Sequence, residues 1–379
     1  MPTITCVEDF RLLYRRRVPK MFYDYAESGS YTESTFRKNE LDMQRVQIRQ
    51  RVGIDISNVD TGATLVGEQV TLPVAFAPVG MLGIQHAGGE IKVAKAAREF
   101  GVPFTLSTMS MCSIEQVAEA TGSPFWFQLY VVKDREFVRD LIQRARAAGC
   151  SKLVVTMDLS MLGQRHKDVK NKLSIRPNLR NMLNIATKPE WALRMAASPY
   201  KTFGNVVGHA KGVDDLASLL TWATESVDPS LNWDDIEWIR NEWGGPVILK
   251  GILDVEDAKI AAEMGIETIV VSNHGGRQLD GAGSSVNWLP RITDVVGDRM
   301  EILLDSGVRT GMDIFRARAL GASGVLLGRA MVYALGAMGQ EGIQRLLSIL
   351  EMEMKTTMGL AGKTDTASIG PSDVYLAGN

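Results

Sequence analysis

Eight short apolar runs follow one another along the chain, starting a little after residue 70. Each run is nearly continuous rather than alternating with polar residues, which is typical of strands buried on both faces of a parallel sheet. The runs occupy residues 73–78, 104–108, 125–129, 153–157, 247–250, 269–272, 302–305 and 325–328. The pattern therefore predicts eight buried strands.

Segments with a helical pattern lie between these runs, at 90–100, 134–148, 254–264 and 310–320 among others. Several follow a residue that can cap a helix, as at Ser113, Asp134 and Asp254, and several end at a glycine. Eight tandem β-then-α units predict an α/β fold, the (β/α)8 TIM barrel. A doubly wound sheet is the alternative, but the GxGxxG fingerprint is missing from the first turn between strand and helix.

The chain outside the barrel is expected to form three further parts of a single domain. Residues 1–70 are charged and aromatic, and we expect them to form an N-terminal helical cap with two helices separated by Pro19. The barrel is expected over 71–355 and a C-terminal tail over 356–379. About ninety residues separate the fourth and fifth runs, far more than a helix and two loops need, so we expect a long inserted loop at 170–235.

The inserted loop combines basic and apolar residues. Residues 170–211 hold eight lysines or arginines against one acid, Glu190. Such a mixture suits contact with the surface of an anionic membrane. A solvated lid whose apolar residues pack on the barrel explains it equally well. The basic residues are Lys170, Lys172, Arg176, Arg180, Lys188, Arg194, Lys201 and Lys211, and the interleaved apolar residues include Leu179, Met182, Leu183, Trp191 and Leu193.

The net charge, the cysteine content and the lack of long apolar segments exclude a few classes of protein. The net charge of −2 over 379 residues gives no general case for binding nucleic acid. Three cysteines without a CxxC pair indicate neither a disulfide framework nor a zinc cluster. The N-terminus lacks the apolar core of a signal peptide, and no run of about 18 apolar residues could span a membrane. We therefore expect a cytoplasmic location, with attachment to a membrane surface still possible.

Polar or glycine residues follow every predicted strand, so the barrel should carry a polar ring at its C-terminal mouth. The turns after strands seven and eight contain Asp305-Ser306-Gly307-Val308-Arg309 and Gly328-Arg329. Barrels bind phosphate at this position through backbone N–H groups and a helix N-terminus. The two turns together predict a phosphate site, which a cofactor or a phosphorylated substrate of an isomerase could occupy.

His274 follows the sixth strand in a turn with two glycines and Arg277. A histidine in such a turn is a good candidate for a general base, although a single histidine is often structural. Asp158, after the fourth strand, could orient the imidazole and stabilise its protonated form. The spacing of His, Cys and carboxylate residues indicates no metal site.

Four motifs closely resemble those of the FMN-dependent L-α-hydroxy acid dehydrogenase/oxidase family. They are PKMFYDYAESG at 19–29, FQLY at 127–130, SNHGGRQLDG at 272–281 and DSGVRTGMD at 305–313. The resemblance extends over essentially the whole chain, and SNHGGRQLD is a highly specific signature. Within the family, the chain is most similar to the bacterial membrane-associated L-lactate dehydrogenases.

The resemblance implies an FMN at the barrel mouth. Its phosphate would lie on Gly307, Arg309, Gly328 and Arg329, and its ribityl chain near Lys250 and Asp305. Lys250 would stabilise the negative charge of the reduced flavin. The whole implied set is Ala77, Pro78, Val79, Gly80, Ser107, Gln128, Thr156, Lys250, Ser272, Asp305, Ser306, Gly307, Arg309, Gly328 and Arg329.

The resemblance also implies how a 2-hydroxy acid would be held and oxidised. Arg277, with Arg165 and Tyr25, would bind the carboxylate, and Tyr130 would bind the hydroxyl or keto oxygen. His274 would accept a proton while Asp158 supports the imidazolium, and two electrons would pass to FMN. L-lactate would become pyruvate. Removal of the Cα proton and removal of the hydroxyl proton with hydride transfer both remain open.

Two departures from the oxidase pattern bear on the electron acceptor. Gly80 stands where oxidases often have alanine, and Asp305-Ser306-Gly307 replaces their Asp-Gly-Gly. Both resemble the membrane-bound dehydrogenases, and the basic insertion points the same way, so we expect a membrane quinone as acceptor and peripheral contact with the inner face of the cell membrane through 176–211. The resemblance to the family also implies a homotetramer. The alternatives are a soluble glycolate or lactate oxidase that uses oxygen, an L-mandelate dehydrogenase, and a non-catalytic flavin-binding scaffold.

Overall fold

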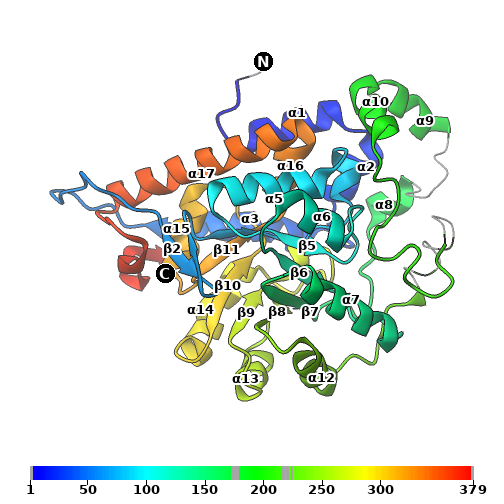
Figure 1. Cartoon of the computed structure of the whole chain (residues 1–379). Helices are drawn as coiled ribbons and strands as arrows, with labels where there is room; N and C mark the ends of the chain where they lie inside the picture. The colour runs from blue at the N-terminus through cyan, green and yellow to red at the C-terminus, as the bar shows by residue number, and fades with distance from the viewer. Residues whose placement is uncertain (1–2, 172–178, 215–217, 219–221, 223–224, 377–379) are drawn as a thin grey trace.

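The computed structural model describes residues 3–171, 179–214, 218, 222 and 225–376, and its centre is an eight-stranded parallel barrel (Figure 1). The strand order is β4-β11-β10-β9-β8-β7-β6-β5, and a parallel bridge between Phe76 and Phe104 joins the two ends of the sheet. The strands are β4 Val74–Phe76, β5 Thr105–Ser107, β6 Trp126–Leu129, β7 Lys152–Thr156, β8 Val247–Ile252, β9 Thr268–Val271, β10 Glu301–Asp305 and β11 Gly324–Leu327. All eight predicted strands and the predicted TIM barrel are confirmed.

The strands are apolar throughout because the sheet is buried on both faces. Inside the barrel, one side chain from most strands contributes to a single cluster, and outside it the remaining apolar side chains pack on the helices. The interior cluster includes Ala75, Trp126, Val154, Ile248, Val270, Leu303 and Leu326.

A short hairpin, β2 Ala63–Leu65 and β3 Glu68–Val70, closes the N-terminal end of the barrel. Leu65 is completely buried in the interior cluster. Glu68 accepts hydrogen bonds from Trp126 Nε1 (3.2 Å) and Ser151 Oγ (2.9 Å). Within residues 1–70, the helical part therefore ends at Arg45, and the remainder consists of extended chain and this hairpin.

Helices surround the barrel between the strands (Figure 1). The predicted caps are present: Ser113 Oγ accepts from Gln116 N, and the Asp134 and Asp254 side chains accept from backbone N–H groups of the first turn. The helices of the barrel are α4 Leu82–Gln85, α5 Gly89–Phe100, α6 Ile114–Thr121, α7 Arg135–Ala147, α12 Trp233–Trp243, α13 Val255–Glu263, α14 Ser285–Val296, α15 Gly311–Ala319, α16 Arg329–Met338 and α17 Gln340–Leu360.

The N-terminal segment lies across the C-terminal mouth of the barrel. It forms α1 Val7–Arg17, α2 Lys20–Ala26 and α3 Ser34–Arg45. Ser30 N donates to Gly276 O (2.9 Å), and the Asn39 and Asn273 side-chain amides exchange two hydrogen bonds (2.7 and 2.9 Å). The strand β1 Val46–Ile48 then pairs with β12 Val374–Leu376, which joins the segment after α3 to the C-terminal segment.

The insertion after β7 contains α8 His166–Lys170, α9 Leu179–Ala186 and α10 Pro189–Ala197, with α9 and α10 at the periphery (Figure 1). Trp191 anchors α10 by donating to Ile84 O (2.8 Å) and packing against Phe22. Two of the basic residues singled out in the sequence, Lys172 and Arg176, lie outside the described residues.

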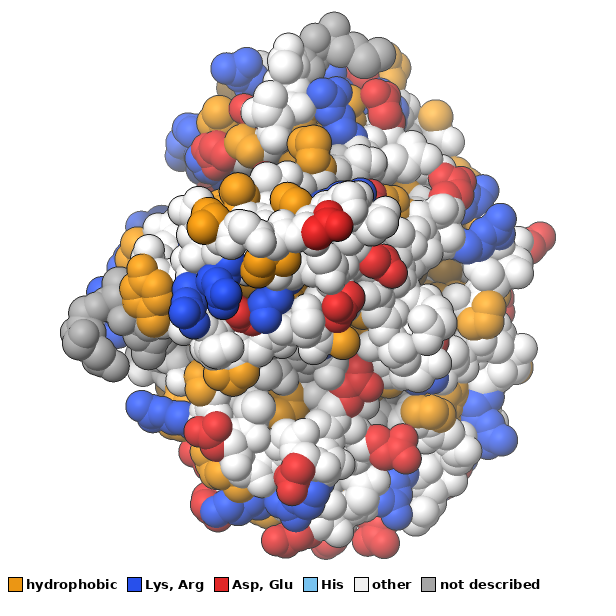
Figure 2. Space-filling model, turned by 90° about the vertical axis from the view of Figure 1, so that its left-hand side faces the viewer, with side chains coloured by type: hydrophobic (Ala, Val, Ile, Leu, Met, Phe, Trp, Pro, Cys, Tyr) orange, Lys and Arg blue, Asp and Glu red, His pale blue; other side chains and the backbone are white. Residues whose placement is uncertain are grey.

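Charged side chains of both signs and apolar side chains are interspersed on the face shown in Figure 2. In the described part of the chain, no helix combines the length and the apolar character needed to cross a bilayer.

Candidate active site

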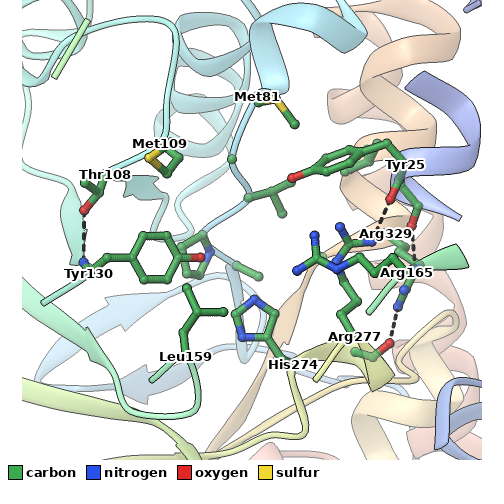
Figure 3. Close-up of a pocket in the computed structure, with 18 of the residues that line it drawn as sticks. Tyr25, Met81, Thr108, Met109, Tyr130, Leu159, Arg165, His274, Arg277 and Arg329 are labelled. Atoms are coloured by element: carbon green, nitrogen blue, oxygen red, sulfur yellow. Dashed lines mark hydrogen bonds between the residues drawn. The ribbon is translucent and has the colours of Figure 1, made fainter. Parts of the chain in front are cut away.

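A cavity of about 500 Å³ opens at the C-terminal ends of the barrel strands, beneath α2. Most of the residues expected at the site line it. They are Tyr25, Ala77, Pro78, Val79, Gly80, Tyr130, Arg165, Lys250, His274, Arg277, Asp305, Ser306, Gly307, Arg309, Gly328 and Arg329. Tyr25, Tyr130, His274 and Arg277 point toward one common space within it (Figure 3).

His274 and Asp158 form a hydrogen-bonded pair, with Nδ1 and Oδ1 2.9 Å apart and both side chains largely buried. A carboxylate only accepts, so Nδ1 carries the hydrogen and Nε2 is left able to accept a proton. Burial lowers the pKa of His274, and the Asp158 carboxylate opposes that effect. The imidazole is therefore suited to be neutral, and so basic, near neutral pH.

The backbone around this pair has unusual geometry. His274 has a φ of 57°, and its N–H donates to Ser272 Oγ (3.0 Å). Gly251 interrupts the pairing of β8 with β9 and has a φ of 102°. A Cβ atom at Gly251 would lie 2.6 Å from Asp158 Cγ, so only glycine leaves room for the carboxylate.

Cationic groups gather on the side of the cavity nearest α2. Arg277 donates from Nη1 to Tyr25 O (2.6 Å) and Ser28 O (3.1 Å), and its guanidinium lies 4.8 Å from the Tyr25 ring centre. Burial, followed by the nearby Arg165, lowers the pKa of Arg277 to about 10. The group stays charged at neutral pH, so this side of the cavity can receive a carboxylate.

Arg165, which lines the cavity, and Asp158, which pairs with His274, each have a buried polar atom without a hydrogen-bond partner in the described structure: Arg165 Nε and Asp158 Oδ2. Tyr130 also lines the cavity, and burial raises the pKa of its hydroxyl, so it remains protonated. Buried polar atoms without partners are costly, and a small polar ligand beside Arg165 would give its guanidinium a partner.

Lys250, Ser272 and Asp305 form a buried network beneath the cavity. Lys250 Nζ lies 2.9 Å from Asp305 Oδ2 and 3.0 Å from Ser272 Oγ, and Ser272 Oγ donates to Asp305 Oδ2 (2.6 Å). Burial alone would lower the pKa of Lys250, but Asp305 and Asp158 raise it. A fixed ammonium is thus held at the cavity floor.

Ser107, Gln128 and Thr156 form a second chain of hydrogen bonds at the ends of β5, β6 and β7. Ser107 Oγ donates to Gln128 Oε1 (2.9 Å), and Gln128 Nε2 donates to Thr156 Oγ1 (3.0 Å). All three are almost completely buried. None of the three is among the residues that line the cavity, although their donors and acceptors are of the kind that suits the edge of a polar heterocycle.

The phosphate end combines a helix N-terminus with two arginines. Gly328 precedes α16 without a side-chain cap, so the first N–H groups of that helix are available to an anion. A Cβ atom at Gly328 would meet only Ala77, at 3.9 Å, which leaves open space at this point. These features and the donor set at the ends of β5–β8 fit FMN.

The two arginines also tie the cap to the barrel, a role that the sequence did not reveal. Arg329 donates to the carbonyls of Ala26, Ser28 and Gly275, each at 2.9 Å, and Arg309 pairs with Glu40 (2.8 Å). This arrangement requires two glycines. A Cβ atom at Gly275 would lie 2.7 Å from Arg329 Nη1, and a Cβ atom at Gly307 would lie 2.4 Å from Asn39 O.

Most of the other residues that line the cavity are apolar. Their pattern in the sequence resembles that of ordinary core residues, so few of them were singled out there. Met109 and Tyr130 lie near each other in the cavity wall, and Met81 and Leu159 lie above and below them (Figure 3). The others include Phe22, Ile84, Thr108, Leu162 and Phe203.

Comparison with known proteins places the chain in one family. The model of the FMN-dependent dehydrogenase family matches residues 14–376. An L-lactate dehydrogenase of Caulobacter vibrioides (strain NA1000 / CB15N) is 47% identical over 97% of this chain and 96% of its own. One of Haemophilus influenzae (strain PittEE) is also 47% identical, over 97% of each chain.

Similar solved structures include a monotopic membrane protein, (S)-mandelate dehydrogenase. It has a TM-score of 0.94 and 33% identity, over 99% of this chain and 100% of the other. A mandelate oxidase has a TM-score of 0.84 and 35% identity, over 98% of each chain. The chain therefore belongs to the FMN-dependent dehydrogenase family and is an oxidoreductase whose cofactor is FMN.

Proposed function

We propose that this protein oxidises an L-2-hydroxy acid to the 2-keto acid, and that the preferred substrate is L-lactate. The observation that carries the proposal is that His274, whose imidazole is paired with the buried Asp158 carboxylate, and Arg277 line one cavity whose floor fits FMN. FMN, when bound, supplies the acceptor for two electrons. The chain's own residues must then bind the carboxylate, orient the substrate and take up a proton.

Each of these tasks falls to a residue with suitable chemistry. Arg277 and Arg165 would pair with the carboxylate, and Tyr25 and Tyr130 would bind substrate oxygens. His274 Nε2 would receive one of the two protons that the substrate loses, and Asp158 would stabilise the resulting imidazolium. Lys250 would place positive charge where the reduced cofactor needs it.

Product identification tests the proposal. We expect purified protein to be yellow and to convert L-lactate, but not D-lactate, to pyruvate when an artificial electron acceptor is present. A colourless protein that interconverts a phosphorylated sugar would instead support the isomerase alternative.

The choice of L-lactate over mandelate rests on similarity of sequence. The relatives that are 47% identical are L-lactate dehydrogenases, whereas the (S)-mandelate dehydrogenase is 33% identical. We expect kcat/KM for L-lactate to exceed that for (S)-mandelate. The reverse order would make this chain a mandelate dehydrogenase.

For the electron acceptor, we propose a membrane quinone rather than oxygen. Gly80 and Ser306 line the cavity at the two positions that depart from the oxidase pattern. Under air-saturated conditions, hydrogen peroxide should form much more slowly than a quinone analogue is reduced. Peroxide formation at a matching rate would support the soluble oxidase alternative.

We further propose a peripheral position on the inner face of the cell membrane, reached through residues 176–211, and a homo-oligomeric assembly. Leu179, Met182, Leu183 and Leu193 of α9 and α10 are between 57% and 73% exposed, and Arg180, Lys188 and Arg194 lie among them. Exposed apolar residues beside basic ones favour binding to anionic lipid.

Sedimentation with anionic vesicles tests the membrane contact. The paired change Met182→Asp and Leu183→Asp should release the protein, whereas Leu360→Asp, at a 57% exposed leucine on α17, should not. Equal release by both variants would contradict a role for the insertion.

A further inference from the structure

The loop between β5 and α6, residues 108–113, carries part of the cavity wall. Met109 lines the cavity and lies against Gly80, where a Cβ atom would come within 3.3 Å of Met109 Cβ. Met81 N donates to Met109 O (2.9 Å). The position of this loop therefore determines how closely Met81 and Met109 approach the other cavity residues (Figure 3).

Glu90, the second residue of α5, holds the loop from one side. It is completely buried, and its Oε1 accepts hydrogen bonds from Met111 N and Gly83 N, each at 3.0 Å. One carboxylate oxygen thus joins the turn that follows Met81 to the loop that contains Met109. A buried carboxylate is costly without such N–H partners, so packing alone does not explain the choice of glutamate.

Asn205, from the returning part of the insertion, holds the loop from another side. It is also completely buried. Its Oδ1 accepts from Ile114 N (2.9 Å), and its Nδ2 donates to Ser110 Oγ (2.9 Å). The carbonyls of Ser107 and Thr108 lie further from Nδ2, at 3.4 and 3.5 Å. The Asn205 amide, with Gly204 N, which donates to Met111 O (3.3 Å), thereby fastens the returning part of the insertion to this loop.

We propose that Glu90 and Asn205 are positioning residues that fix the 108–113 loop, and that they set the size of substrate side chain that the cavity accepts. Neither residue lines the cavity, so both act through Met81 and Met109. The proposal rests on the proposed function in taking a 2-hydroxy acid as substrate. It adds two residues outside the cavity to those that decide which acid is preferred.

Selectivity is the first test. For FMN-saturated protein, we expect Glu90→Ala and Asn205→Ala to change the ratio of kcat/KM for L-2-hydroxyhexanoate to that for L-lactate by roughly tenfold, the size of effect that one methylene makes in an apolar pocket. Glu90→Gln keeps a carbonyl oxygen for both N–H groups and should keep the wild-type ratio. Glu301→Ala removes a carboxylate that accepts from Val66 N (2.9 Å) at the other end of the barrel, and should also leave the ratio unchanged.

Amide hydrogen exchange is the second test and needs no substrate. Glu90→Ala should remove protection at Gly83 and Met111, and Asn205→Ala should remove it at Ile114, with little change elsewhere. Exchange that rises evenly over the chain would overturn the proposal, as would an unchanged selectivity ratio despite the local loss of protection. Wild-type protein that oxidises no 2-hydroxy acid would refute the proposed function, and the exchange data alone would then decide whether the loop is fixed as described.

Discussion

The Nδ1 atom of His274 lies 2.9 Å from the Oδ1 atom of Asp158, although the two residues are 116 positions apart in the chain. His274 follows β9 and Asp158 follows β7, so their approach depends on β8 between them. Gly251 in β8 provides the space that the carboxylate occupies. The site therefore depends on three neighbouring strands, and each can be tested separately.

Asp158→Asn should lower turnover by roughly 10²–10⁴-fold, the range for a misplaced or weakened general base. The carboxylate raises the pKa of His274 against the lowering effect of burial, so its removal lowers that pKa further. The neutral imidazole is the active form, and activity is lost as pH falls through the pKa. The acid limb of kcat/KM against pH should therefore move to lower pH. An acid limb at the same pH in the variant and the wild type would contradict an effect of Asp158 on the pKa of His274.

Arg277→Lys should lower kcat/KM for L-lactate by roughly a hundredfold, because hydrogen bonds to a charged group contribute about 1.5–3 kcal/mol and a lysine cannot reproduce the planar fork. The main effect should be a higher KM. Arg45→Lys is a matched control, since Arg45 pairs with a carboxylate, that of Asp42, does not line the cavity and has a side chain that is 71% exposed. An equal fall of kcat/KM in Arg277→Lys and Arg45→Lys would contradict a role for Arg277 in binding the substrate carboxylate.

Comparing Gly251→Ala with Gly244→Ala distinguishes the effect of backbone strain from that of a steric clash with Asp158. Both glycines have positive φ, so each change should destabilise the fold by about 1–2 kcal/mol in thermal or chemical unfolding. Only Gly251→Ala pushes a Cβ atom against Asp158, and nothing lies within 4 Å of one at Gly244. Turnover should fall in the first variant alone. Normal turnover in Gly251→Ala would show that the position of Asp158 is unimportant.

Lys250→Met should destabilise the FMN-saturated protein by about 3–5 kcal/mol at pH 7, because it leaves the Asp305 carboxylate buried without its cation. Burial tends to raise the pKa of Asp305, and in the wild type Lys250 holds it below its usual value. In the variant this pKa should rise above that of the unfolded chain. The loss of stability should then shrink as pH falls through the raised pKa, in a series of melting temperatures between pH 7 and pH 5. A loss of stability that does not change with pH would instead indicate that the variant disturbs side-chain packing.

The barrel could be predicted because its signal is local: each apolar run became one strand. The β2–β3 hairpin could not, because residues 63–70 contain no extended apolar run and Val66 adopts a positive φ that its sequence does not suggest. The pairing of β1 with β12 joins residues more than 300 positions apart, for which no local pattern exists.

The residues of the site were predictable in kind but not in their connections. Polar residues at strand ends and the resemblance to a known family pointed to His274, Arg277 and Lys250. The tertiary partners of these residues, such as Ser272 beside Lys250 and Tyr25 O beside Arg277, depend on the fold. Glu90 and Asn205 looked like ordinary helix and loop residues, because only burial distinguishes them.

Anaerobic reduction of the bound flavin by L-lactate tests the central claim most directly, with wild-type protein and His274→Gln compared at equal FMN content. We predict complete bleaching of the wild-type flavin with one pyruvate formed per FMN, and a rate at least roughly a thousandfold lower in the variant, which should keep its FMN. Bleaching of the variant at the wild-type rate, or a wild-type flavin that L-lactate does not reduce, would contradict the account.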